Sequence, residues 1–99
     1  MNMIKMNSFV IFDGTESKII EINQDEQIKI QGVGSGTYTI KGRLSSDCEW
    51  DTICAIKASD FSKSTVIADT NIWIADVSGY SHVTVSASGY TKIYATTIG

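Results

Sequence analysis

Apolar and polar residues alternate with a period of two along most of this chain, and this pattern constrains the fold more than any other feature. The clearest example is residues 37–44, whose inward-facing set is predicted to be Tyr38, Ile40, Gly42 and Leu44. Such alternation is typical of strands in an antiparallel sheet that buries one face. No segment carries apolar residues at helical spacing over three turns, so the pattern argues against helical folds.

About eight to nine short strands can be placed in this way, at a spacing of roughly ten residues. The predicted strands cover residues 8–12, 17–22, 27–31, 37–44, 50–56, 65–68, 72–77, 82–88 and 91–96. Turns are predicted at Asp13-Gly14, across the glycine cluster 32–36, at Ser78-Gly79 and at Ser88-Gly89. A single helical turn around Phe61 is the one ambiguous place.

We therefore predict an all-β fold, an antiparallel β-sandwich of jelly-roll type, with a barrel topology left open. The 99 residues fit a single domain covering 1–99, in which residues 1–7 form a flexible or docking N-terminal arm. The cluster Gly32, Gly34 and Gly36 leads directly into a strand, which indicates a hairpin turn. A phosphate-binding loop would have to open a helix or end in Gly-Lys-Ser/Thr.

One short internal repeat is present. Residues 77–85 align with residues 87–95, and both segments contain Ser-Gly-Tyr followed by two polar residues and an alternating stretch. The offset of ten residues is that of one strand and one turn, which is too short for a solenoid repeat. We expect two successive hairpin turns in which Gly79 and Gly89 adopt unusual backbone angles and Tyr80 and Tyr90 cap the sheet edge.

Composition excludes several classes of protein. The net charge is −3, from 8 basic and 11 acidic residues, which gives no electrostatic attraction to nucleic acid or anionic lipid. Hydrophobic residues make up 42% of the chain, too many for a disordered tail. No apolar run approaches the roughly 20 residues of a transmembrane helix or resembles a signal peptide. We expect synthesis in the cytoplasm, with any later location reached by assembly or lysis.

The cysteines and acidic residues give no clear metal or disulfide site. Cys48 and Cys54 would lie roughly 20 Å apart in one extended segment, so two reduced thiols are predicted, with Cys54 in the core. Asp47, Glu49 and Asp51 alternate and would share one side of a strand. A solvated acidic loop is favoured there, and a calcium site is the alternative.

Residues for catalysis are also hard to find. The single histidine, His82, falls on the polar side of its predicted alternating strand and is therefore predicted to lie on the surface. No serine stands in a nucleophile-elbow frame, and no spacing indicates a triad. We therefore predict no catalytic residue, no cofactor and no metal, and a protein that is not an enzyme.

Aromatic residues are the remaining candidates for a binding role. Trp50 starts a predicted strand and is expected in the core. Trp73 has the opposite parity to Ile72 and Ile74, so one of these two sets must face outward. The possible ligand or subunit contacts are Trp73, Tyr80, Tyr90 and Tyr94.

Two stretches of the chain carry a resemblance. Residues 74–85, followed by Ser88-Gly89, and residues 34–47, followed by Trp50 and Ile53, resemble the strands and turns of small β-sandwich proteins in tailed-phage virions and prophages. The match covers residues 34–99 and is one of turns and strands, a pattern that carbohydrate-binding sandwiches share in large part.

The resemblance implies a structural or attachment component of a virion, of the head-decoration, head-fibre or tail-associated type. Such proteins act as homo-oligomers or as many copies on a lattice, in contact with other virion proteins. A sandwich of this size buries only about two-thirds of its unfolded surface, so association would add stability. The alternative is a carbohydrate-binding module that uses exposed Trp or Tyr side chains.

Overall fold

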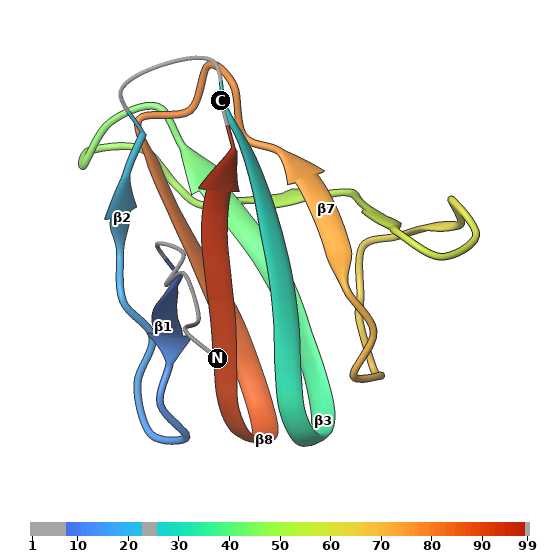
Figure 1. The fold of residues 1–99 in the computed structure, drawn as a ribbon. Helices are drawn as coiled ribbons and strands as arrows, with labels where there is room; N and C mark the ends of the chain where they lie inside the picture. The colour runs from blue at the N-terminus through green and yellow to red at the C-terminus, as the bar shows by residue number, and fades with distance from the viewer. Residues whose placement is uncertain (1–7, 23–25, 99) are drawn as a thin grey trace, which may run out of the picture.

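The computed structural model describes residues 8–22 and 26–98 and contains eight antiparallel strands (Figure 1). In chain order the strands are β1 (Phe9–Phe12), β2 (Ile20–Glu21), β3 (Gln27–Arg43), β4 (Asp51–Ile53), β5 (Ala55–Lys57), β6 (Lys63–Ser64), β7 (Trp73–Asp76) and β8 (His82–Ile98). Within those residues no helix is long and apolar enough to cross a membrane. The prediction of an all-β antiparallel fold is confirmed. The predicted arm, residues 1–7, lies outside the described residues.

The centre of the fold is a ribbon formed by β3 and β8, each 17 residues long. The two strands pair from Gln27↔Ile98 at one end to Arg43↔His82 at the other, with register shifts between Val33 and Thr37. At these shifts the whole ribbon folds over, as the lower ends of β3 and β8 show in Figure 1. The prediction of separate short strands here, joined by hairpins at glycines 32–36 and at Ser88-Gly89, is therefore wrong. Each predicted turn is a bend inside one long strand.

Two glycines that face each other make this bend possible. Gly89 has a φ of 94°, and a Cβ added there would lie 2.7 Å from the carbonyl oxygen of Ser35. A Cβ at Gly36 would overlap the carbonyl oxygen of Ser88. The two strands approach so closely at the bend that neither backbone tolerates a side chain there.

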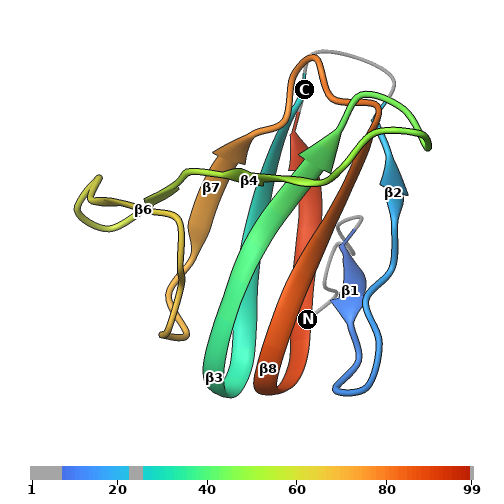
Figure 2. The same ribbon diagram turned by 180° about the vertical axis from the view of Figure 1, so that it is seen from behind.

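Folding the ribbon over produces two layers that face each other (Figures 1 and 2). The front layer has the order β1-β8-β3-β7-β5-β6 and uses the second half of β8 with the first half of β3. In the back layer, β2 pairs with the first half of β8 and β4 pairs with the second half of β3. All the strands belong to one continuous sheet because the ribbon runs through both layers. The predicted sandwich arrangement is confirmed.

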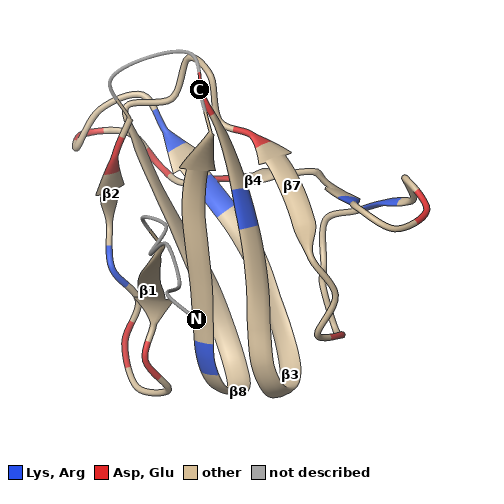
Figure 3. Ribbon diagram, in the orientation of Figure 1, with Lys and Arg blue, Asp and Glu red and all other residues tan. Residues whose placement is uncertain are grey.

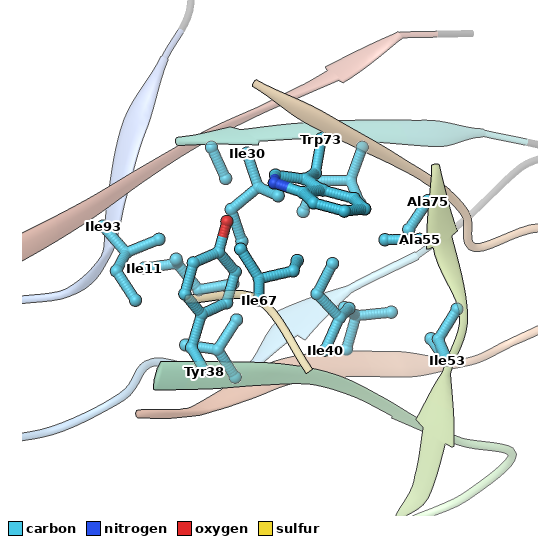
Figure 4. Packing of buried hydrophobic residues seen from close by; sticks show 14 of the residues in the cluster. Ile11, Ile30, Tyr38, Ile40, Ile53, Ala55, Ile67, Trp73, Ala75 and Ile93 are labelled. Carbon is cyan, nitrogen blue, oxygen red and sulfur yellow. The ribbon is translucent and has the colours of Figure 1, made fainter. Parts of the chain in front are cut away.

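The core lies between the two layers. Ile30 from the front part of β3 faces Tyr38 and Ile40 from its back part (Figure 4), and these three residues are fully buried, as is Ile28. Even-numbered residues of β3 point inward before and after the bend, so one side of the ribbon lines the whole interior. The Tyr38 hydroxyl is buried and has no hydrogen-bond partner among the described residues, and this burial raises its pKa.

Other predictions near the strand ends are wrong. Leu44 is exposed because β3 ends at Arg43 and the chain turns away. Cys54 is exposed because its neighbours Ile53 and Ala55 take the inward positions. Trp50 precedes β4 and is only half-buried.

Some predicted strands are shorter than expected or absent. The predicted strand 65–68 is reduced to one bridge between Ile67 and Tyr38. The predicted strand 50–56 is divided into β4 and β5 at Cys54. At the ambiguous place the Phe61 N–H donates to the Lys57 carbonyl at 2.8 Å, which closes one turn between β5 and β6.

Candidate functional site

The four aromatic residues predicted as contacts occupy different environments. Trp73 and Tyr90 belong to the core, with 4% and 3% of their surface exposed, and Tyr80 is half-buried against it. Tyr94 is 39% exposed and lies on the outer surface of the front layer. In this chain Tyr94 is therefore the one of the four that offers an open aromatic surface.

Tyr80 and Tyr90 explain the internal repeat. The ring of Tyr90 packs over Gly32, where a Cβ would lie 2.6 Å from the ring. The ring of Tyr80 packs over Gly42 in the same manner, where a Cβ would lie 2.5 Å from it. Gly79 and Gly89, which precede the two tyrosines, both have positive φ as predicted. The rings cover glycines of β3 and not the sheet edge, so the repeated Ser-Gly-Tyr packs two aromatic rings onto the ribbon.

Trp73 and Tyr90 also fix the loop that precedes β7. The indole N–H of Trp73 donates to the carboxylate of Asp69 at 2.8 Å, and the Tyr90 hydroxyl donates to the Asp69 backbone carbonyl at 2.7 Å. Lys57 forms an ion pair with the same carboxylate at 3.3 Å. Partial burial acts to raise the pKa of Asp69, but hydrogen bonds from Trp73 and Asn71, together with Lys57, outweigh it and hold the pKa below its usual value. These contacts give both aromatic residues a structural role.

Tyr94 belongs to an extended apolar surface. Tyr94 on β8 is paired with Val10 on β1. Two residues further along β8, a continuous row of paired residues crosses four strands, in the order Thr96, Lys29, Ile74 and Ile56. Because paired residues point to the same side of a sheet, these side chains share the outer surface of the front layer. We call this surface the apolar face, and its apolar members are Val10, Ile56, Ile72, Ile74, Tyr94 and Ile98.

A hollow of about 260 Å³ lies in the apolar face. Ile72, Tyr94 and Ala95 are among its apolar lining residues, and Lys29 and Gln31 are among its polar ones. Most of the ribbon of this layer is uncharged, with blue segments on β3 and near the lower end of β8 (Figure 3). An exposed apolar surface with a hollow and few charges is typical of a surface that binds another molecule.

The isoleucines of this face were not among the predicted contacts, although the sequence contained a signal for them. The opposite parity of Trp73 required either Trp73 or the pair Ile72 and Ile74 to face outward. The structure places Trp73 inside, Ile72 exposed and Ile74 half-buried on the outer side. Ile56 gave no such signal because its short strand, β5, has only three residues.

The outer surface of the back layer differs in character. Its residues on the ribbon are hydroxylic or basic and include Thr39, Lys41, Arg43, Thr84 and Ser86. The guanidinium of Arg43 lies 4.2 Å from the centre of the Trp50 ring, and its Nε donates to Nδ1 of His82 at 3.3 Å. His82 is half-buried under this contact. We call this surface the polar face.

The remaining candidates are dispersed. Asp47, Glu49 and Asp51 are all exposed, and no group of three His, Cys, Asp or Glu side chains within residues 8–22 and 26–98 is placed to hold a metal ion. Cys48 and Cys54 are both free thiols, as predicted. The acidic segment therefore gives no ligand set for calcium in this structure.

Two solved structures share this fold. The SPBc2 prophage-derived protein YomS superposes with a TM-score of 0.74 at 15% sequence identity, over 95% of this chain and 96% of that one. The PBSX exported protein XepA gives a TM-score of 0.76 at 13% identity, over 92% of this chain but only 36% of XepA. No protein-family model and no curated protein sequence matches the chain. At these identities the likeness establishes a fold shared with prophage-encoded proteins.

Proposed function

We propose that this protein is a non-enzymatic structural or attachment module of a phage or prophage particle, and that it acts by self-association and by packing on other virion proteins. The observation that carries the proposal is the apolar face, which leaves Ile56, Ile72, Tyr94 and Ile98 exposed on one layer. Water-exposed apolar area on a sheet is stabilised when another surface covers it. The fold shared with two prophage-encoded proteins supports the same assignment.

The arrangement suits a docking surface for mechanical reasons. The strands beneath the apolar face are fixed by ladder pairing across β1, β8, β3, β7 and β5. A partner therefore meets a preorganised surface and loses little conformational entropy of this chain on binding. Tyr94 is well suited to anchor such a contact, since aromatic residues concentrate binding energy at protein interfaces.

Native mass spectrometry and light scattering on the purified chain test this proposal. We expect a homo-oligomer for the natural sequence and a shift to monomer for Tyr94→Glu, which places a charge at the centre of the face. Ser86→Glu is the matched control, because it places the same charge on the polar face and is expected to leave the mass unchanged. A natural chain that stays monomeric at every concentration would refute self-association.

A carbohydrate-binding module is the second candidate, favoured by the exposed Tyr94 ring beside Gln31 and Lys29 in the hollow. An aromatic ring flanked by polar groups is suited to stacking on a sugar. A glycan array probed with the natural chain and with Tyr94→Ala distinguishes the two. Signals lost in the variant would favour this candidate, and an array without signals would remove it.

A further inference from the structure

Phe61 is the most exposed large hydrophobic residue of the described chain. It lies in the turn between β5 and β6, and 78% of its surface is exposed. Figures 1 and 2 show this hairpin projecting from the side of the sandwich opposite β1 and β2. Its φ of 62° is the one positive value recorded for a non-glycine residue in the described ranges. A bulky residue rarely adopts this backbone angle, and such outliers point to a functional position.

The turn holds Phe61 in this conformation through specific hydrogen bonds. The N–H of Phe61 donates to the Lys57 carbonyl at 2.8 Å. One carboxylate oxygen of Asp60 accepts from the backbone N–H of Ser62 at 2.9 Å and from its hydroxyl at 2.7 Å. The two bonds from Ser62 lower the pKa of Asp60 below its usual value, so its carboxylate stays ionised to a lower pH than that of an ordinary aspartate. An aromatic ring is thus presented to solvent beside a negative charge, on a turn whose shape is already set.

The hollow in the apolar face has the complementary properties. The hollow has a volume of about 260 Å³ and is open to solvent, so a phenyl group of a second molecule can enter it from outside. Ile72 and Tyr94, which are exposed and line the hollow, offer apolar contacts to such a ring. Lys29 also lines the hollow and carries the charge opposite to that of Asp60.

We propose that Phe61 of one copy inserts into this hollow of a second copy, with Asp60 beside Lys29. The inference rests on the proposed self-association and names the contact that produces it. Because the projecting ring and the hollow are different surfaces of the chain, the contact either is reciprocal and closes a twofold dimer or runs head-to-tail from copy to copy. Repetition of such a contact closes a ring or extends a filament, depending on the rotation between copies.

Phe61→Asn is the sharpest variant, because asparagine tolerates positive φ better than phenylalanine while removing the ring. We expect its midpoint of thermal unfolding to equal or exceed that of the natural chain at a concentration where both are monomeric. Its association constant, measured by sedimentation equilibrium, should fall at least tenfold. Phe61→Leu is the control and should keep part of the association. An unchanged association constant in Phe61→Asn would overturn the proposal.

Photo-crosslinking identifies the contact directly. With p-benzoylphenylalanine at position 61, peptide mapping of the crosslinked dimer should place the new bond on the segments around Ile72 or Tyr94 of the second copy. A bond mapped elsewhere would refute this contact. If Tyr94→Glu abolishes association while Phe61→Asn does not, the proposed function stands and this contact fails. If the natural chain never associates, both fail.

Discussion

The two outer surfaces of the sandwich are built on one ribbon yet have opposite characters. Strands β3 and β8 supply both, with Lys29, Tyr94 and Thr96 in front and hydroxylic or basic residues behind. The flanking strands make much of the difference. β7 and β5 add Ile74 and Ile56 to the apolar face. β4 adds Thr52 and β2 adds Glu21 to the polar face.

This contrast distinguishes the residues that stabilise the fold from the residues that are proposed to bind a partner. The inward residues of both layers belong to one apolar, buried core, so the core gives no reason for the outer surfaces to differ. A polar outer surface is the ordinary state of a half-buried sheet. The apolar outer surface departs from it, and this departure is the reason for the proposed contact with another molecule.

The largest expected effect follows from changing the bend that separates the two faces. Gly89→Ala should lower the free energy of unfolding by about 3 kcal/mol, because it combines a positive φ with a clash against the Ser35 carbonyl. Urea denaturation followed by tryptophan fluorescence measures the change. Gly79→Ala is the matched control, since Gly79 also has positive φ but nothing lies within 4 Å of an added Cβ. We expect a loss of about 1 kcal/mol there. Equal losses in the two variants would mean that crowding at the bend is unimportant.

A smaller effect should distinguish the two faces. Arg43→Ala removes the guanidinium from the Trp50 ring and from His82 on the polar face. We expect a loss of about 1 kcal/mol in the free energy of unfolding. The oligomeric mass should remain that of the natural chain. Lys41→Ala, on the same strand and side, should cost less because no ring contact is lost. A change of oligomeric mass in Arg43→Ala would mean that the polar face also takes part in association.

The smallest effect concerns pH. Because the pKa of Asp69 is lowered in the folded protein, its ionisation stabilises the fold above the usual value of 3.8, and this stabilisation disappears as the pH falls through the lowered pKa. Asp69→Asn should therefore lower the free energy of unfolding at pH 7 by less than about 1 kcal/mol. The difference from the natural chain should vanish at the lowest pH. Denaturation at a series of pH values measures this difference. If it persists in strong acid, the substitution acts through the shape and hydrogen bonding of the side chain and not through its charge.

Alternation predicted much of the fold from the sequence. It placed Tyr38, Ile40 and Gly42 on the inward side of their strand, where the structure has them buried. It did not predict that the segments around residues 27–31 and 37–44 are one strand. The glycines between them are equally compatible with a hairpin and with a folded ribbon. Only the pairing of both halves with β8, distant in sequence, decides between the two.

The candidate site was harder to predict. Tyr94 was named from its residue type, but its exposure depends on which strands flank β8. Phe61 lies in a turn, where period-two alternation carries no information about exposure. Trp73 and Tyr90 were named on the same grounds as Tyr94, yet both are buried and their polar atoms are used in hydrogen bonds to Asp69. Those contacts arise from loop geometry that no local pattern encodes.

The position of β8 in the chain has a consequence for biosynthesis. This strand pairs with β1, β2 and β3, yet it is the last of the eight to emerge from the ribosome. Until residues 82–98 have been translated, β1 and β2 lack their pairing partner and the ribbon cannot form. The nascent polypeptide must therefore keep β1 and β2 unpaired until β8 has been made, a period in which they are open to chaperones and to aggregation.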